Sequence, residues 1–256
     1  MKITFYGTGS SQGVPVIGCK CDVCMSSDSN DKRLRASILI ETRNKKLLID
    51  AGTDFRQQLL RGGISDLDAI LLTHEHKDHT GGLDDVRALN YISGKPVEIY
   101  AEKRVLDSIC SEYPYAFADN PYPGVPEMNL NTISDETYFT VGDIKIVPVR
   151  VFHYRLPVLG FRIDGLAYVT DANRIELSEM KKICGCRVLV VNALRKESHL
   201  AHFSLSQAID VARETGSQQT YLTHISHQMG LHRAVNEELP TNIQLAYDCL
   251  TIEIPE

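Results

Sequence analysis

The sequence predicts an α/β protein, a four-layer αββα sandwich built from two pseudo-symmetric halves in a single domain over residues 1–256. Two observations lead to this prediction. Strand-like and helix-like segments alternate along the chain, and the order of motifs in the first half recurs in the second. Two such halves packed face to face would bury each sheet between the other sheet and its own helices.

The first half contains short apolar runs and amphipathic stretches bounded by polar turns. Strands are predicted at 36–42, 46–52, 69–73 and 97–101, and helices at 83–90 and 102–113. Residues 113–131 carry four prolines and four aromatic residues, which predicts an ordered surface loop rather than a linker. We expect this loop to form one wall of the substrate pocket or a contact in a homodimer.

The second half repeats this order of motifs. In each half a hairpin ends in Asp-Ala, and a helical spacer, an apolar strand, a polar loop with a histidine and a helix follow. Asp50 occupies the position of Asp171 in this repeat, and His79 occupies that of His202. Strands and helices repeat in every α/β protein, so the matching aspartates and histidines are the features that favour a true repeat.

The charge balance narrows the classes of ligand. The net charge of −6 argues against broad nucleic-acid binding, because that function needs a basic face. A small anionic substrate is compatible with it, since bound metal ions supply local positive charge. The N-terminal segment has no apolar signal-peptide core, and the apolar runs are too short to span a bilayer. We therefore expect a cytoplasmic protein without membrane association.

The strongest chemical signal is the segment THEHKDH at 73–79, which directly follows a predicted strand. It brings together His74, His76, Asp78 and His79. Imidazole and carboxylate groups are ligands for zinc and other divalent transition metals. In an extended or tightly turning loop, His74 and His76 can face one ion while Asp78 and His79 face a second.

Further candidate ligands follow apolar runs in the second half, namely His153, Asp171 and His224. Side chains just beyond strand ends gather at ligand sites in α/β folds. His153 could instead be an ordinary loop histidine, and Asp171 could cap a following helix at Asn173. His224 ends an apolar strand beside a second histidine, which makes it the strongest of these candidates.

A second cluster of candidate ligands is rich in cysteine. Cys19, Cys21 and Cys24 form a C-x-C-x-x-C motif within a chain of seven cysteines, an odd count that argues against a disulfide framework. Three thiolates make a zinc site only with a fourth ligand, and His227 is the candidate. Because His224 and His227 lie three residues apart, one could face the catalytic metals and the other the cysteines. The alternative is that the cysteines are free thiols.

The histidine-rich segment also resembles a known family signature. THEHKDH is similar to the HxHxDH motif of the metallo-β-lactamase superfamily, and the downstream candidates fit that family's remaining ligand positions in order. The resemblance covers nearly the whole chain and implies two divalent ions, zinc or manganese, plus one structural zinc on the cysteine cluster. It implies His74, His76 and His153 at one ion, Asp78, His79 and His224 at the other, and Asp171 between them.

Two more segments, GTGSSQGVPVIGCKCDVC and LTHISHQ, resemble cyclic-phosphate phosphodiesterases associated with carbon–phosphorus lyase pathways. This resemblance implies hydrolysis of a small ribose cyclic phosphate by hydroxide held between the metals, with Asp78 and His202 as catalytic residues. His202 fits the position of the family's histidine acid, although His199 remains an alternative. Ser204 is a predicted N-cap of the following helix. Asp50 is expected to orient a metal-binding histidine.

Two other functions fit parts of the sequence. A tRNA 3′-processing endoribonuclease of the ribonuclease Z type would share the metal ligands and the histidine acid. The acidic net charge and the lack of a basic arm argue against it. A non-catalytic zinc-binding module would need only the cysteine site, so the full set of histidine and aspartate ligands argues against that function. The expected partner is a small phosphodiester.

Overall fold

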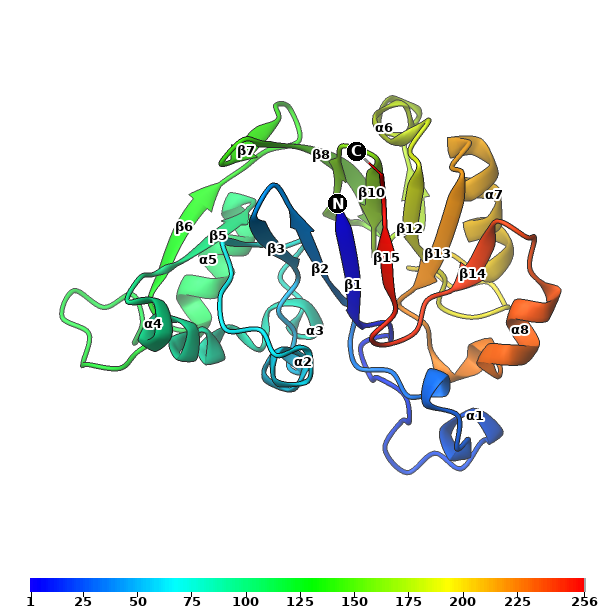
Figure 1. Ribbon diagram of the computed structural model, residues 1–256, viewed down its shortest axis with the longest axis horizontal. Helices are drawn as coiled ribbons and strands as arrows, with labels where there is room; N and C mark the ends of the chain where they lie inside the picture. The colour runs from blue at the N-terminus through cyan, green and yellow to red at the C-terminus, as the bar shows by residue number, and fades with distance from the viewer. Residues whose placement is uncertain (256) are drawn as a thin grey trace.

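Two β-sheets face each other, and helices cover their outer faces in this computed structural model, which describes residues 1–255 (Figure 1). The first sheet has the order β15-β1-β2-β3-β4-β5-β6. The second has the order β11-β8-β9-β10-β12-β13-β14, with β7 paired to β8. Helices α2 to α5 lie on one side of the molecule and α6 to α8 on the other. The predicted four-layer sandwich is therefore confirmed.

The strands are short, as expected for a sandwich of this size. The first sheet contains β1 (Lys2–Gly7), β2 (Ser37–Thr42), β3 (Lys45–Ile49), β4 (Ala69–Leu71), β5 (Val97–Ala101), β6 (Met128–Thr132) and β15 (Thr251–Glu253). The second contains β7 (Phe139–Val141), β8 (Ile144–His153), β9 (Leu156–Ile163), β10 (Leu166–Val169), β11 (Arg174–Ile175), β12 (Val188–Asn192), β13 (Gln219–Thr223) and β14 (Ile243–Leu245).

The helices connect these strands. They are α1 (Asp22–Met25), α2 (Phe55–Gly62), α3 (Lys77–Thr80), α4 (Arg87–Ser93), α5 (Lys103–Glu112), α6 (Leu177–Ile183), α7 (Leu205–Thr215) and α8 (His232–Glu238). Short 3₁₀ turns are η1 (Ser29–Asp31), η2 (Leu83–Val86) and η3 (His227–Met229). Within residues 1–255, no helix combines the length and the apolar character that crossing a membrane requires.

The pairing pattern of the first sheet recurs in the second. Strands β1, β2 and β3 are antiparallel neighbours, and β3, β4, β5 and β6 are parallel neighbours. Strands β8, β9 and β10 repeat the antiparallel part, and β10, β12, β13 and β14 repeat the parallel part. The internal repeat predicted from the sequence is thus a repeat of topology. It places Asp50 after β3 and Asp171 after β10, at equivalent strand ends.

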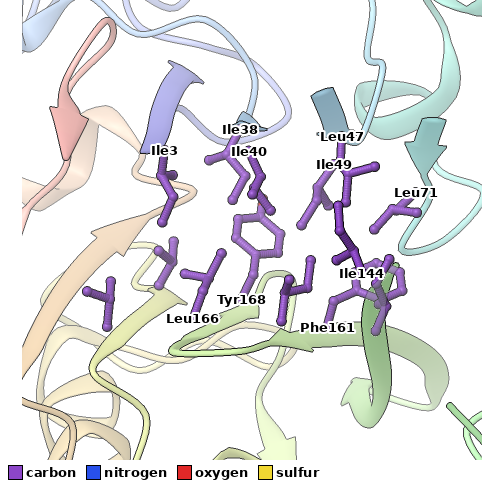
Figure 2. Packing of buried hydrophobic residues seen from close by; sticks show 14 of the residues in the cluster. Ile3, Ile38, Ile40, Leu47, Ile49, Leu71, Ile144, Phe161, Leu166 and Tyr168 are labelled. Atoms are coloured by element: carbon purple, nitrogen blue, oxygen red, sulfur yellow. The ribbon is translucent and has the colours of Figure 1, made fainter. Parts of the chain in front are cut away.

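The apolar core between the sheets holds the halves together. Figure 2 shows Ile3, Ile38, Ile40, Leu47 and Ile49 of the first sheet facing Phe161, Leu166 and Tyr168 of the second. Alternate residues of β2 and β3, such as Leu39 and Leu48, instead pack under the helices. Full burial of each such aliphatic side chain contributes roughly 1.5–3 kcal/mol. Strands β2 and β3 contain continuous apolar runs in the sequence, because one face of each packs against the other sheet and the opposite face packs under helices.

The proline-rich loop begins where the sequence predicts but ends earlier. Residues 128–131, assigned to the loop, form most of strand β6 at the edge of the first sheet. The amides of Asn129 and Asn131 donate to the Glu98 carboxylate at 2.6 and 2.8 Å, which fixes this edge pairing. Tyr113 is buried and its hydroxyl donates to Thr80 O at 3.2 Å. The base of the loop is thus anchored beside helix α3.

Candidate active site

The candidate ligands meet at one edge of the sandwich because they all follow strand ends. The His74–His79 segment follows β4, His153 ends β8, Asp171 follows β10 and His224 follows β13. The first sheet therefore contributes one group of ligands and the second sheet contributes the other. The sequence could place each residue at a strand end, and the packing of the sheets brings these ends together.

The histidine loop is held by the residue that precedes it. Thr73 N and Oγ1 both donate to the Asp50 carboxylate, at 2.9 to 3.1 Å. The Thr73 hydroxyl also lies 3.0 Å from His74 Nδ1, which leaves His74 Nε2 free to face the cluster. His74 Nε2 and His76 Nδ1 then lie only 3.0 Å apart. Two ring nitrogens this close are placed to share one ion.

Asp50 supports a second histidine in the same way. His79 Nδ1 donates to Asp50 Oδ2 at 2.7 Å, and both side chains are fully buried. This contact orients the ring so that His79 Nε2 faces Asp78 and Asp171, at 3.2 and 3.0 Å. Asp50 has a φ of +64°, a left-handed backbone conformation that is uncommon for residues other than glycine. Its position corresponds to the expected role of orienting a ligand.

Asp171 lies at the centre of the cluster. Its Oδ2 is 3.3 Å from His74 Nε2 and 3.0 Å from His79 Nε2, and its Oδ1 is 2.8 Å from His224 Nε2. It too has a left-handed backbone, with φ of +52°. The alternative role as a helix cap is wrong, because strand β11 follows and helix α6 begins only at Leu177. The Asn192 side chain pins this turn through two hydrogen bonds to the Ala172 backbone.

His153 reaches the cluster from the end of β8. Its Nδ1 donates to Ala201 O at 2.9 Å, so its Nε2 points inward. The ring centroid lies 4.5 Å from that of His202, 5.3 Å from that of His76 and 6.0 Å from that of His74. Its ligand atom groups with Asp171 and His202 rather than with the two histidines of the loop. The remaining groups are His74, His76 and Asp171, and Asp78, His79, Asp171 and His224.

Burial and neighbouring charge set the protonation of the cluster. Burial lowers the pKa of His74 to about 4, so its imidazole is neutral and offers a lone pair. Burial acts to raise the pKa of Asp171, but His224 and His79 outweigh it and hold that pKa well below its usual range. Burial lowers the pKa of His224, and Asp171 more than compensates and raises it to about 9. The carboxylate is therefore ionised, as a metal ligand must be.

The buried nitrogens also test whether these residues fit metal ions. His79 Nε2 and both ring nitrogens of His224 are buried and make no hydrogen bond to any of residues 1–255. His79 Nε2 and His224 Nε2 lie 3.0 and 2.8 Å from the Asp171 carboxylate, but they are not aligned for hydrogen bonds to it. Both nitrogens are directed toward a common point instead. Orphaned polar atoms of this kind call for a missing partner. The donor set of imidazoles and carboxylates suits divalent transition metals.

The cysteine cluster forms a separate candidate site. Cys19 Sγ and Cys21 Sγ each lie 3.3 Å from His227 Nδ1, and all four ligand atoms, with Cys24 Sγ, lie within 4.8 Å of one another. Tetrahedral zinc with Zn–S near 2.3 Å places ligands roughly 3.5–4 Å apart, which this spacing allows. A backbone hydrogen bond within the loop and then His227 lower the pKa of Cys21 to about 6. The cluster therefore offers a thiolate.

His202 lies beside the histidine and aspartate cluster. It is mostly buried, and its ring centroid lies 4.8 Å from that of His224 and 5.2 Å from that of His199. Helix α7 follows, and the predicted N-cap is confirmed. The Ser204 side chain accepts from Gln207 N at 3.4 Å, while Gln207 Oε1 accepts from Ser204 N at 2.9 Å. This capping box fixes the loop that carries His202.

Several supporting residues were missed by the sequence analysis. Thr73 and Asn192 hold the ligand turns, and Arg104 on α5 forms an ion pair with Glu75 inside the histidine loop. Gly52 is needed for close approach, since a Cβ there would lie 2.0 Å from Asp78 O. Of these, only Thr73 and Glu75 lie within the recognised motif. The contacts of Asn192 and Arg104 join distant segments, so no local pattern marks them.

Comparisons with known proteins agree with this geometry. Residues 45–225, which include every histidine and aspartate of the cluster, match the family described as Beta-lactamase superfamily domain. The fold is similar to that of a diphosphatase from the PhnP family, with a TM-score of 0.92 and 37% sequence identity over 99% of this chain and 98% of that chain.

Two curated relatives have other names. The chain is 44% identical over 258 residues to an octanoyltransferase from Porphyromonas gingivalis, covering 100% of this chain and 52% of that protein. It spans about half the length of that relative, whose name describes the whole protein. It is also 24% identical over 268 residues to a ribonuclease Z from Methanopyrus kandleri, covering 87% of this chain and 92% of that protein.

Proposed function

The chain belongs to the metallo-β-lactamase superfamily and, within it, to the PhnP family of metal-dependent hydrolases, and from this premise we propose that it hydrolyses a small phosphate diester of the ribose cyclic phosphate type. The observation that carries the proposal is the convergence of three candidate ligand groups on the buried Asp171 carboxylate, one of which contains His153 and His202. A carboxylate shared by such groups suits a pair of ions, and a histidine beside them suits proton transfer.

We assign the ligands on this basis. By the family's ligand pattern, His74, His76 and His153 would hold one divalent ion, Asp78, His79 and His224 the other, and Asp171 both. His153 joins the first ion by that pattern alone, because its ligand atom lies with those of Asp171 and His202. Zinc or manganese fits this donor set, and a third ion, a structural zinc, fits the cysteine cluster.

Two ions in these positions would supply a hydroxide nucleophile near neutral pH and positive charge opposite the phosphate oxygens. The side chains of the protein supply the remaining functions. Asp50 keeps the His79 ring in the orientation that faces the cluster, through the 2.7 Å hydrogen bond. Asp171 is almost completely buried at the edge of the sandwich, so the surrounding side chains keep water away from its carboxylate.

His202 would donate the proton that the leaving alkoxide needs. In the free protein, burial and then His224 lower the pKa of His202 to about 3, so its ring is neutral. A phosphate anion bound beside it favours the charged form and raises that pKa. Binding of the substrate phosphate would therefore favour the protonated ring, which is the form that can act as the acid. Asp78 contributes to catalysis as a ligand rather than as a proton donor, since its pKa lies far below the usual range.

A second candidate substrate is a diphosphate. The observation that favours it is the 37% identity to a PhnP-family diphosphatase over nearly the full length of both chains. Hydrolysis of a phosphoanhydride would use the same ligands, but its leaving group is a phosphate that departs without a donated proton. The importance of His202 therefore separates the two substrates. A tRNA substrate is disfavoured by the net charge of −6.

The proposal is tested by a panel assay on purified protein stripped with a chelator and reloaded with zinc or manganese. The panel contains a ribose cyclic phosphate, a 2′,3′-cyclic nucleotide, a nucleoside diphosphate ester, a precursor tRNA and an octanoyl thioester. We expect the highest kcat/KM on a cyclic diester and loss of that activity in the stripped protein. Preferred hydrolysis of the diphosphate, the tRNA or the thioester would overturn the assignment to cyclic diesters.

A further inference from the structure

A groove of about 500 Å³ opens directly beside the candidate metal cluster. Its lining is largely apolar and comes from the β8–β9 turn and the segment before His202, namely His153, Tyr154, Arg155, Leu156, Pro157, Leu200 and Ala201. His153 belongs both to this lining and to the ligand cluster. The groove is therefore continuous with the place where a phosphate would bind.

Tyr154 lines this groove with an exposed side chain and a strained, left-handed backbone. The residue has a φ of +58°, although a bulky side chain disfavours this conformation. It is nevertheless 45% exposed, so burial of the ring does not explain its presence in the turn. Asparagine or glycine would satisfy such a turn with less strain. The turn therefore holds an aromatic ring at the groove for a reason other than folding.

Asn173 holds the two walls of the groove together. Its side-chain oxygen accepts from Tyr154 N at 2.9 Å, and its side-chain nitrogen donates to Leu200 O at 2.8 Å. One amide thus fixes both the aromatic wall and the aliphatic wall, where Leu200 is 67% exposed. Asn173 follows Asp171 by two residues, so the groove and the cluster are built on the same turn.

We propose that this groove is the subsite for a planar ring carried by the phosphate diester, with Tyr154 as the stacking surface. The proposal rests on the proposed function and adds to it the class of substrate, a diester in which one esterified group carries a planar ring, such as the base of a cyclic nucleotide or an aryl group. A planar ring suits a shallow groove with one aromatic wall, because stacking needs only one face. The Arg155 guanidinium lies over one face of the Tyr154 ring, with its Cζ 5.1 Å from the ring centroid.

The test compares two diesters with the same leaving group, bis(p-nitrophenyl) phosphate and methyl p-nitrophenyl phosphate, on the metal-loaded protein. Tyr154→Asn removes the ring but tolerates the left-handed backbone, whereas Tyr154→Phe keeps the ring. We expect Tyr154→Asn to lower kcat/KM for the aryl diester about tenfold relative to the methyl diester, the typical contribution of one stacked ring. Tyr154→Phe should keep the wild-type ratio.

A control and a binding readout complete the design. Tyr138→Ala removes an aromatic ring that is 58% exposed and does not line the groove, so it should leave the ratio unchanged. Calorimetry with adenosine monophosphate and ribose 5-phosphate should show tighter binding of the base-bearing ligand, and Tyr154→Asn should abolish that preference. An unchanged ratio in Tyr154→Asn, or equal losses on both diesters, would overturn the subsite. Failure of the metal-loaded wild type to hydrolyse the ribose cyclic phosphate and the 2′,3′-cyclic nucleotide, as well as both aryl diesters, would overturn the proposed function itself.

Discussion

His224 and His227 lie three residues apart, yet they belong to two different ligand clusters. His224 Nε2 is 2.8 Å from Asp171 Oδ1, while His227 Nδ1 is 3.3 Å from the thiols of Cys19 and Cys21. The left-handed backbone of His224, with φ of +53°, turns the chain between them. One turn after β13 thus connects the cysteine cluster to the candidate active site.

Removal of a cysteine ligand should separate the two sites. We expect Cys21→Ser to lose one zinc and lower the melting temperature, because structural zinc binding is coupled to folding. Asp78→Asn should instead keep the zinc on the cysteines and lose activity with little change in melting temperature. Elemental analysis and thermal denaturation of both variants measure this. Equal losses of metal and stability in the two variants would contradict separate roles.

His202→Ala should keep the metal content if His202 is the acid, because the ligand assignment proposed above does not include it; loss of an ion would instead make His202 a ligand, as its grouping with His153 and Asp171 allows. Turnover on an alkyl diester should fall by about 10² to 10⁴, the usual contribution of a positioned proton donor. The loss should be much smaller with p-nitrophenolate as the leaving group, since that group departs without a proton. His199→Ala is the matched control. If it shows the leaving-group dependence instead, the acid is His199.

Gly52→Ala should disturb the ligand loop through the backbone. A Cβ at this position would lie 2.0 Å from Asp78 O, so the segment that carries Asp78 and His79 must shift. We expect weaker metal binding in titrations with zinc or manganese and a large loss of activity. Gly63→Ala is the control, because it adds left-handed strain but meets no atom within 4 Å. Comparable loss of metal affinity in both variants would point to general destabilisation.

His232 should make stability depend on pH. Burial and then the Arg33 guanidinium lower the pKa of His232 from 6.5 to about 4, and Arg33 lies 3.1 Å from its Nδ1. Between these two pKa values the unfolded chain binds a proton that the folded chain does not, so stability falls as the pH falls through this window. The shift corresponds to at most about 3 kcal/mol.

The measurement compares the wild type with His232→Asn by urea denaturation at about pH 7.5 and about pH 5. Both proteins lose stability from their other acid-sensitive groups. The wild type should lose more, because only it carries the depressed histidine. A variant that loses as much stability as the wild type over this range would contradict the assignment.

The sequence predicted most of the elements, and it placed the candidate ligands at strand ends, where the structure has them, because both depend on local pattern. Apolar runs marked β2, β3, β4 and β5, and Ser204 marked the start of α7. The predicted range of the loop, 113–131, includes four residues that belong to β6, because the pairing of β6 at the sheet edge depends on Glu98 in β5. Local pattern does not contain that contact.

The geometry within the site was less accessible from sequence. Nothing near His153 indicates that it lies closer to His202 than to His74, because that depends on how the two sheets pack. The strained turn at Tyr154 could not be predicted either, because its hairpin lacks the glycine or asparagine that is typical of such turns. Its tie to Asn173 and Leu200 exists only in three dimensions.

The division of the ligands between the two halves has a mechanical consequence. The His74–His79 segment belongs to the first sheet, whereas His153, Asp171 and His224 belong to the second. Ions held by this set would act as cross-links between halves that otherwise cohere at this edge through apolar packing and a few hydrogen bonds, such as the one from Leu159 N to Thr73 O. Pulling the halves apart, or opening them for a protease, would then require breaking coordination bonds as well as exposing the core. Metal supply would in this way set the lifetime of the chain as well as its activity.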